Sequence, residues 1–181
     1  MRVFRNHGIT TDHRQREEQG SWFYEMVDLG YNYRLTDVQC ALGVSQLRKL
    51  PGWIRRRQEI ARRYDEAFAE LSTVEPLAVR EEVSHAYHLY MIRLDVRRLR
   101  VTRAEVFAAL VAEGIGVNVH YVPVHLHPFY REHFGTGLGS CPVAEAAYER
   151  LITLPMFPRM GDEDVDDVIA AVRKVMKAYC R

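Results

Sequence analysis

The stretch GYNYRLTDVQ, residues 30–39, decides the fold of this 181-residue chain, because a loop meets the start of a helix there. Thr36 stands three residues before Gln39, and an apolar run follows. This spacing is typical of a capping box, in which the Thr36 hydroxyl accepts from the Gln39 N–H and the Gln39 side chain binds the Thr36 N–H. We therefore predict that a helix begins at about Asp37.

The first two turns of this helix are apolar on almost every side. A helix without a polar face is expected to be buried all round. The loop before it, with Asn32 and Arg34, should then lie deep in the protein or at a subunit contact. Polar side chains in such a place need partners, which either an anionic ligand or nearby backbone carbonyls can supply. The apolar positions are Val38, Cys40, Ala41, Leu42, Val44 and Leu47.

The overall composition excludes several classes of protein. With 25 basic and 24 acidic residues, the net charge is +1, which argues against a dedicated nucleic-acid-binding protein. The three cysteines show no ligand-like spacing and favour a reducing, cytoplasmic location. The first residues lack the apolar core of a signal peptide, and we expect no membrane-spanning segment.

Pro51 suits the first turn of a second helix, predicted to end near Leu71. One face of this segment is apolar, and the opposite face is rich in arginine. An arginine run can bind RNA, but here acidic residues alternate with it, so we favour a solvated face with i,i+4 ion pairs.

The remaining segments predict further strands and helices. Residues 85–94 resemble a strand covered on both faces, and residues 115–121 a second strand. Thr102 and Glu105 form another capping box, whose helix Gly114 should end. Residues 161–178 predict a final amphipathic helix, and the polar residues 11–20 a surface loop.

Four histidines lie within fourteen residues and raise the question of a metal site: His120, His125, His127 and His133. Zinc needs three or four converging donors. Pro123 and Pro128 interrupt this segment, and no H-x-x-x-H helix or C-x-x-C pair accompanies it. We therefore predict no metal site, and a histidine–metal hydrolase is the weakest of the alternatives.

Residues 22–39, WFYEMVDLGYNYRLTDVQ, resemble the second half of the DegT/StrS family of sugar aminotransferases. These are pyridoxal-phosphate (PLP) enzymes of fold type I that place an amino group on a keto-sugar nucleotide. Within this family, these residues resemble the branch that aminates C4 of a UDP-linked 4-keto-6-deoxy-N-acetylhexosamine in the pseudaminic acid pathway. RNHG at residues 5–8, HYVP at 120–123 and LITLP at 151–155 resemble further family segments.

The resemblance implies roles for several residues. Asn32 would reach across a homodimer to the phosphate of the neighbouring subunit's PLP, with Arg34 as its supporting cation. Tyr31, His120 and Tyr121 would contact the nucleotide-sugar substrate. L-Glutamate would be the amino donor, and neither nucleic acid nor membrane would be a partner.

The resemblance also implies how the chain is divided. In the family, roughly half of the protein precedes the segment that here begins at Arg5, so the chain is expected to be a C-terminal fragment. Residues 1–35 would end the large PLP domain, 36–71 would form connecting helices at the dimer interface, and 72–181 a small C-terminal domain. The fold class would be α/β, with interface helices and a small α+β domain whose short, mainly antiparallel sheet is flanked by helices.

No catalytic residue is expected in this chain, because the Schiff-base lysine of the family has no counterpart here. The three lysines, Lys49, Lys174 and Lys177, fall in or at the end of predicted helices with no cofactor motif nearby. The chain alone is therefore expected to be inactive. The alternative is a stand-alone dimerisation or sugar-nucleotide-binding module.

Overall fold

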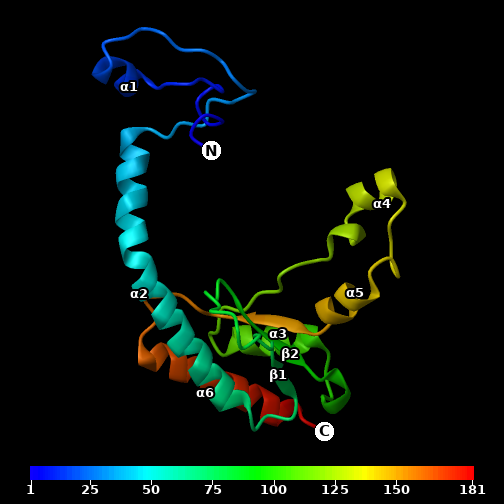
Figure 1. Ribbon diagram of the computed structural model, residues 1–181. Coiled ribbons are helices and arrows are strands. Elements are labelled where there is room, and N and C mark those ends of the chain that lie inside the picture. The colour runs from blue at the N-terminus through cyan, green and yellow to red at the C-terminus, as the bar shows by residue number, and fades with distance from the viewer. The chain divides into compact units, whose positions relative to one another are not determined.

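The computed structural model describes all residues from 1 to 181, which form two compact units, Met1–Leu50 and Pro51–Arg181. Figure 1 shows the helices and strands of both units in chain order. The first unit holds α1 (His13–Glu18) and the beginning of α2 (Asp37–Phe68). The fold is α/β, with one small antiparallel sheet, as the sequence predicted.

Residues 11–20 are not a plain surface loop, so that prediction is wrong. Asp12 caps α1 by accepting from the Gln15 N–H at 3.1 Å, and the Gln15 side chain accepts from the Asp12 N–H at 2.9 Å. This is a capping box with aspartate and glutamine in place of threonine and glutamate. The spacing was present in the sequence, but the segment has no apolar periodicity to mark a helix.

The helix α2 begins where residues 36–39 predicted. The Thr36 N–H donates to the Gln39 side chain at 2.9 Å, and the Gln39 N–H donates to the Thr36 hydroxyl at 3.3 Å. The predicted break at Pro51 is wrong, because this proline lies inside one helix of 32 residues. Proline removes a single backbone N–H, and the flanking turns supply their own hydrogen bonds.

The first half of α2 is exposed within this chain, contrary to the prediction that it is buried all round. Val38 is 80% exposed and Leu47 is 65% exposed. The buried residues of α2 begin at Ile60, in the second unit. The apolar side chains at the start of α2 therefore have no cover from the chain itself.

The sheet of the second unit has the order β1-β2-β3, with β1 (Val74–Pro76) and β3 (Leu151–Leu154) antiparallel to the central β2 (Tyr90–Leu94). In β2, burial alternates, so that one face is fully buried and the other is half-buried. The predicted strand at 115–121 is wrong, since only Asn118 pairs with Thr153 there. The Asn118 side chain accepts from the next amide, Val119 N–H, at 2.7 Å, and the ladder ends.

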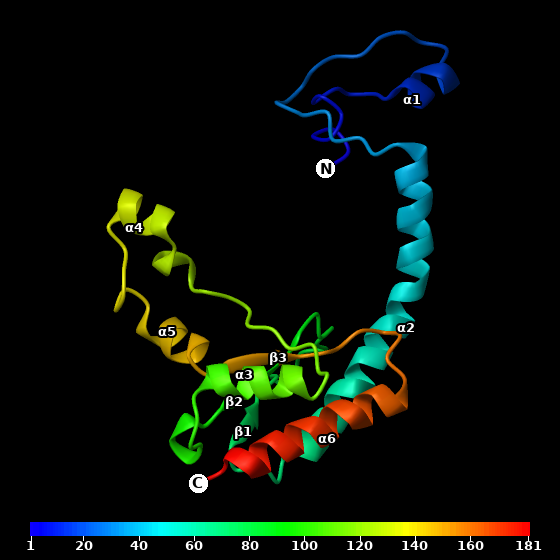
Figure 2. The ribbon, with the colours of Figure 1, turned by 180° about the vertical axis from the view of Figure 1, so that it is seen from behind.

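Helices α3 (Arg103–Ala112) and α6 (Asp162–Tyr179) pack with the later half of α2 around this sheet, as Figure 2 shows. The Thr102–Glu105 capping box and the final amphipathic helix are confirmed. Gly114 follows α3 with φ of 81°, a left-handed conformation that favours glycine. Fully buried side chains of the core include Tyr64, Phe68, Ile92, Leu94, Leu110, Ile152 and Val172.

Two short 3-10 helices and two short α-helices complete the second unit: η1 (Val96–Arg98), η2 (Val124–Leu126), α4 (Pro128–Phe134) and α5 (Pro142–Tyr148). In Figure 2, α4 lies away from the sheet, at the far end of an extended path that returns through α5 to β3. None of the helices has both the length and the apolar composition that crossing a bilayer requires.

The arginines of α2 bind mainly to other elements, and not within their own helix as predicted. Arg56 donates to the Met160 carbonyl at 2.7 Å and to the Asp162 carboxylate at 2.8 Å. Arg63 also donates to Asp162 at 2.8 Å. Arg56 with Glu59 is the one pair at helical spacing, at 3.5 Å. These arginines connect α2 to the start of α6.

Asp162→Asn is expected to lower stability at neutral pH but not in acid. The Arg56 guanidinium holds the pKa of Asp162 below its usual range, so the folded state favours the ionised carboxylate. This stabilisation is present above the unfolded pKa of about 4 and is lost as the pH falls through the lower folded value. The urea midpoints of wild type and variant should converge on acidification. Asp167→Asn, which removes an exposed carboxylate without an ion pair, is the control, and a difference independent of pH would contradict the prediction.

Candidate functional site

The loop at residues 30–34 lies against the chain's first residues. The Tyr31 N–H donates to the Phe4 carbonyl at 2.7 Å, and the Tyr33 N–H donates to the Arg5 carbonyl at 3.0 Å. Between them, the His7 N–H donates to the Tyr31 carbonyl at 3.0 Å. These bonds bring the RNHG and GYNYR segments together side by side.

Two glycines allow this close approach. A Cβ on Gly30 would lie 2.0 Å from the Gly8 nitrogen, and a Cβ on Gly8 would lie 1.7 Å from the Asp28 carbonyl oxygen. Gly8 also has φ of 70°, in the left-handed region. The glycines of both motifs are therefore needed for the crossing itself.

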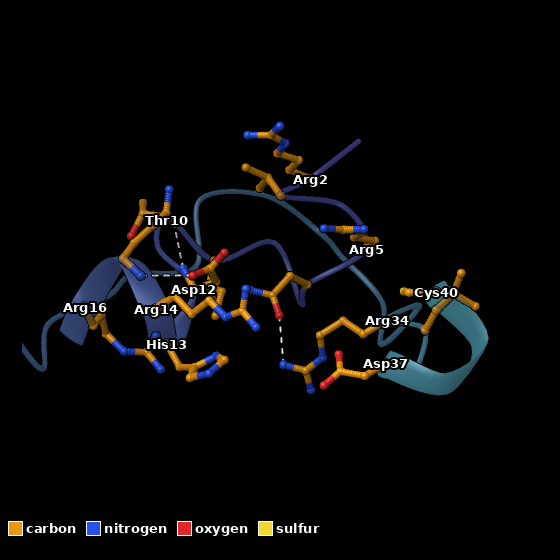
Figure 3. A pocket seen from close by; sticks show the side chains of 15 residues that line it. Arg2, Arg5, Thr10, Asp12, His13, Arg14, Arg16, Arg34, Asp37 and Cys40 are labelled. Carbon is orange, nitrogen blue, oxygen red and sulfur yellow. Dashed lines mark hydrogen bonds between the residues drawn. The ribbon is translucent and has the colours of Figure 1, made fainter. Parts of the chain in front are cut away.

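Asn32 and Arg34 are brought together in this crossing. Arg34 Nε donates to the Asn32 side-chain oxygen at 3.2 Å, and Arg34 Nη1 donates to the Asn6 side-chain oxygen at 2.9 Å. The second bond is drawn as a dashed line in Figure 3. Because a guanidinium can only donate, it fixes the amide oxygen of Asn32 toward Arg34. The amide NH2 of Asn32, which is exposed, then remains available as a donor.

A basic cavity of about 660 Å³ lies beside Arg34 in the same unit. Figure 3 shows its side chains coming from the first residues, from α1 and from the start of α2. None of its arginines lies within ion-pair distance of a carboxylate, so their charge is free to attract an anion. One of its two acids, Asp12, is engaged as the cap of α1, and the Gln15 N–H lowers its pKa. The arginines are Arg2, Arg5, Arg14, Arg16 and Arg34.

Tyr31 belongs to an aromatic group on the same loop. Its ring stacks on that of Tyr33, with centroids 5.2 Å apart, and meets the edge of Phe4 at the same distance. The Tyr31 side chain is 44% exposed, and no hydrogen bond within the chain uses its hydroxyl. A rigid aromatic surface thus lies next to Asn32.

His120 and Tyr121 lie in the second unit. His120 Nδ1 forms a hydrogen bond of 2.8 Å with the hydroxyl of Thr153, which is buried on β3. Tyr121 is 70% exposed, and its ring meets that of His120 edge-on at 4.5 Å. His120 is thus anchored, while the Tyr121 phenol is presented to solvent.

The four clustered histidines do not converge. His125 pairs with Glu145 at 2.8 Å, and His133 binds the Phe129 carbonyl of its own helix at 2.9 Å. No group of three histidine, cysteine or acidic side chains in the chain is arranged to hold a metal ion.

Sequence reasoning found the Asn32 loop but missed most of the cavity. Arg2, Arg14 and Arg16 were not singled out, although four arginines fall in the first sixteen residues. That density was a usable signal. Their convergence on Arg34 was not visible, because it depends on the crossing of two segments that lie far apart in sequence.

Residues 1–173 match the model of the DegT/DnrJ/EryC1/StrS aminotransferase family. The chain is 41% identical over 179 residues to the spore coat polysaccharide biosynthesis protein SpsC of Bacillus subtilis, covering 98% of this chain and 46% of SpsC.

Two solved structures show the same fold. PseC of Helicobacter pylori, an aminotransferase involved in the biosynthesis of pseudaminic acid, is 28% identical, with a TM-score of 0.78 over 98% of this chain and 45% of PseC. Spr1654 of Streptococcus pneumoniae, in its PMP form, is 34% identical, also with a TM-score of 0.78, over 98% of this chain and 44% of its own. The chain thus spans less than half the length of each of these proteins.

Proposed function

This chain belongs to the DegT/DnrJ/EryC1/StrS aminotransferase family, and from that membership we propose that it forms part of a PLP-dependent sugar aminotransferase. The proposed reaction transfers an amino group from L-glutamate to the 4-keto group of a 6-deoxy sugar nucleotide. PLP, when bound, supplies the electron sink that this transfer requires. Residues 1–35 would complete a PLP domain, 36–71 would connect it to a neighbour, and 72–181 would be the small domain.

The donors at Asn32 fit a phosphate. A phosphate oxygen needs hydrogen-bond donors and a nearby positive charge. The Asn32 amide NH2 supplies the donor, because Arg34 holds its oxygen at 3.2 Å. Arg34 supplies the charge and is itself fixed by Asn6 at 2.9 Å. This arrangement is the observation that carries the proposal that Asn32 binds the cofactor phosphate.

The basic cavity supports a nucleotide-linked substrate. A sugar nucleotide carries a diphosphate, and guanidinium groups bind phosphates in a bidentate manner. The arginines that converge on the cavity have no carboxylate partners in the chain. We assign Tyr31, His120 and Tyr121 to the sugar-nucleotide, with the Tyr121 phenol as an exposed hydrogen-bonding group.

The exposed start of α2 supports a homodimer. Val38, Leu42 and Leu47 are each more than 60% exposed, and a continuous apolar helix surface of this kind normally has a partner. In the proposed dimer this surface brings Asn32 to the phosphate held by the neighbouring subunit. The same observation favours the second candidate, a stand-alone dimerisation module, which would dimerise but bind no PLP.

The catalytic lysine is proposed to lie outside these 181 residues. Lys49 is on α2, Lys174 and Lys177 are on α6, and none lines the basic cavity. The chain's own residues would bind and orient, and the chain alone would not transaminate.

Asn32→Ala is expected to weaken PLP binding by about tenfold to a hundredfold in a protein that joins this chain to a PLP domain, because the lost bond is to a charged phosphate. Affinity is measured by equilibrium dialysis, and transamination by the release of 2-oxoglutarate from L-glutamate with a UDP-linked 4-keto sugar. Asn118→Ala removes an exposed asparagine of the second unit and should leave PLP affinity unchanged. Equal affinities for wild type and Asn32→Ala would refute the assigned role. A dimer that binds no PLP would favour the second candidate.

A further inference from the structure

The segment between Val117 and Ile152 contributes nothing to the hydrophobic core of the second unit. We call residues 120–145 the arm; it includes η2, α4 and the start of α5. Most of its apolar side chains, such as Phe129, Phe134 and Leu138, are exposed. The one buried residue of the arm is His125, which is polar and 9% exposed. Polar contacts, and not apolar burial, must therefore hold the arm.

Those contacts converge on the carboxylate of Glu145, on α5. It accepts hydrogen bonds from His125 Nε2 at 2.8 Å, from the Gly139 N–H at 2.9 Å and from the Cys141 N–H at 3.1 Å. The Gly139 N–H holds the pKa of Glu145 below its usual range, so the carboxylate is ionised at neutral pH. The hydroxyl of Thr136 donates to the His125 carbonyl at 2.9 Å, which is a second contact between His125 and a later part of the arm. One ionised group thus ties the beginning of the arm to its end.

The segment from His120 to His125 is consequently fixed at both ends. His120 is bound to Thr153 on β3 at 2.8 Å, and His125 is bound to Glu145 on α5 at 2.8 Å. Tyr121 lies between these anchors with its ring 70% exposed and no hydrogen bond of its own. The Tyr121 side chain forms no hydrogen bond in the chain, so its orientation depends on the backbone between these two anchors and on its edge-on contact with His120.

We propose that Glu145 is a positioning residue that acts through His125 to hold Tyr121 in the orientation in which it meets the substrate. This inference rests on the proposed function in one respect, that Tyr121 contacts the sugar-nucleotide. Glu145 itself touches no substrate. Its effect is to exclude alternative conformations of the segment before the substrate binds, which lowers the entropic cost of binding.

Glu145→Gln tests this directly, since the amide keeps the shape but has one acceptor oxygen for three donors. We expect the Gly139 and Cys141 amides of the 181-residue chain to exchange with deuterium about tenfold faster, as a bond to an ionised group is lost. In protein labelled with 3-fluorotyrosine, the Tyr121 fluorine resonance, assigned with Tyr121→Phe, should move toward the position of free fluorotyrosine. The Ile92 amide, on β2, should exchange at the wild-type rate.

Two further variants separate positioning from general destabilisation. Glu149→Gln removes an exposed carboxylate four residues later and should change neither readout. Thr136→Val removes only the bond to the His125 carbonyl and should move the Tyr121 resonance in the same direction, but less. If Glu145→Gln fails to fold, Thr136→Val decides the question by the same resonance.

A Tyr121 resonance that stays at its wild-type position when the Gly139 and Cys141 amides have been released would overturn the inference. The part of the proposed function on which this inference rests, the contact of Tyr121 with the substrate, fails by a different result. If UDP, used as the probe, does not perturb the Tyr121 resonance of a wild-type protein that contains the PLP domain, Tyr121 has no substrate role. The fixation of Tyr121 by Glu145 can then still be read from the exchange data and the resonance.

Discussion

Phe68→Ala is expected to lower the unfolding free energy of the second unit by about 3–5 kcal/mol, the usual cost of truncating a fully buried phenylalanine. Phe68 is 0% exposed, and its ring stacks on Tyr64 with centroids 5.7 Å apart. Both residues anchor the later half of α2 on the sheet, where Tyr64 also meets Tyr90 at 4.9 Å. A domain of this size has only about 5–15 kcal/mol of stability in total, so the loss should be a large fraction of it.

The measurement is urea unfolding of the 181-residue chain followed by circular dichroism. Phe134→Ala provides a matched control, because the same side chain is removed from α4, where it is 66% exposed. Its effect should stay within about 1 kcal/mol, as surface substitutions usually do. Similar midpoints for the two variants would mean that α2 does not pack on the sheet through Phe68.

Gly30→Ala is expected to open the crossing of residues 4–8 and 30–34. The new Cβ would lie 2.0 Å from the Gly8 nitrogen and 2.6 Å from the His7 carbonyl carbon. Both are backbone atoms, which cannot rotate aside as a side chain can. If the two segments separate, the three hydrogen bonds between them are lost, at about 1 kcal/mol each. The amides of His7, Tyr31 and Tyr33 should then exchange more than about a hundredfold faster.

Gly43→Ala is the matched control for this substitution. Gly43 lies inside α2, and a Cβ there would meet nothing within 4 Å. Alanine should stabilise the helix by about 0.5–1 kcal/mol. The two glycine variants are therefore expected to change stability in opposite directions. Unchanged exchange of Tyr31 and Tyr33 in Gly30→Ala would show that the crossing tolerates the added methyl group. The donor geometry at Asn32 would then need another explanation.

Hydrogen exchange also tests how closely the site depends on the crossing. Arg34 reaches Asn6 only because the two segments lie side by side. In Gly30→Ala, Arg34 should lose this contact and Asn32 should lose its fixed orientation. The proposed phosphate contact of Asn32 is thus expected to weaken in Gly30→Ala even though Asn32 itself is unchanged.

The errors of the sequence-based expectations share a cause. The strand predicted at residues 115–121 and the helix break at Pro51 were both inferred from local residue preference alone. Only Asn118 finds a partner on β3, and α2 continues past Pro51 because one missing N–H does not end a helix. The burial expected for the start of α2 assumed a partner surface that this chain does not contain.

The sequence by itself determined where α2, α3 and α6 begin and to which family the chain belongs. The capping boxes at Thr36 and Thr102 and the amphipathic α6 depend on residues three or four positions apart, and such short-range spacing is readable without a structure. Family motifs are likewise contiguous. Tertiary structure alone decided that Arg34 meets Asn6, 28 residues away, and that His125 meets Glu145, 20 residues away. No local spacing encodes such pairs, because they arise only when loop crossings and packed elements bring distant side chains into contact.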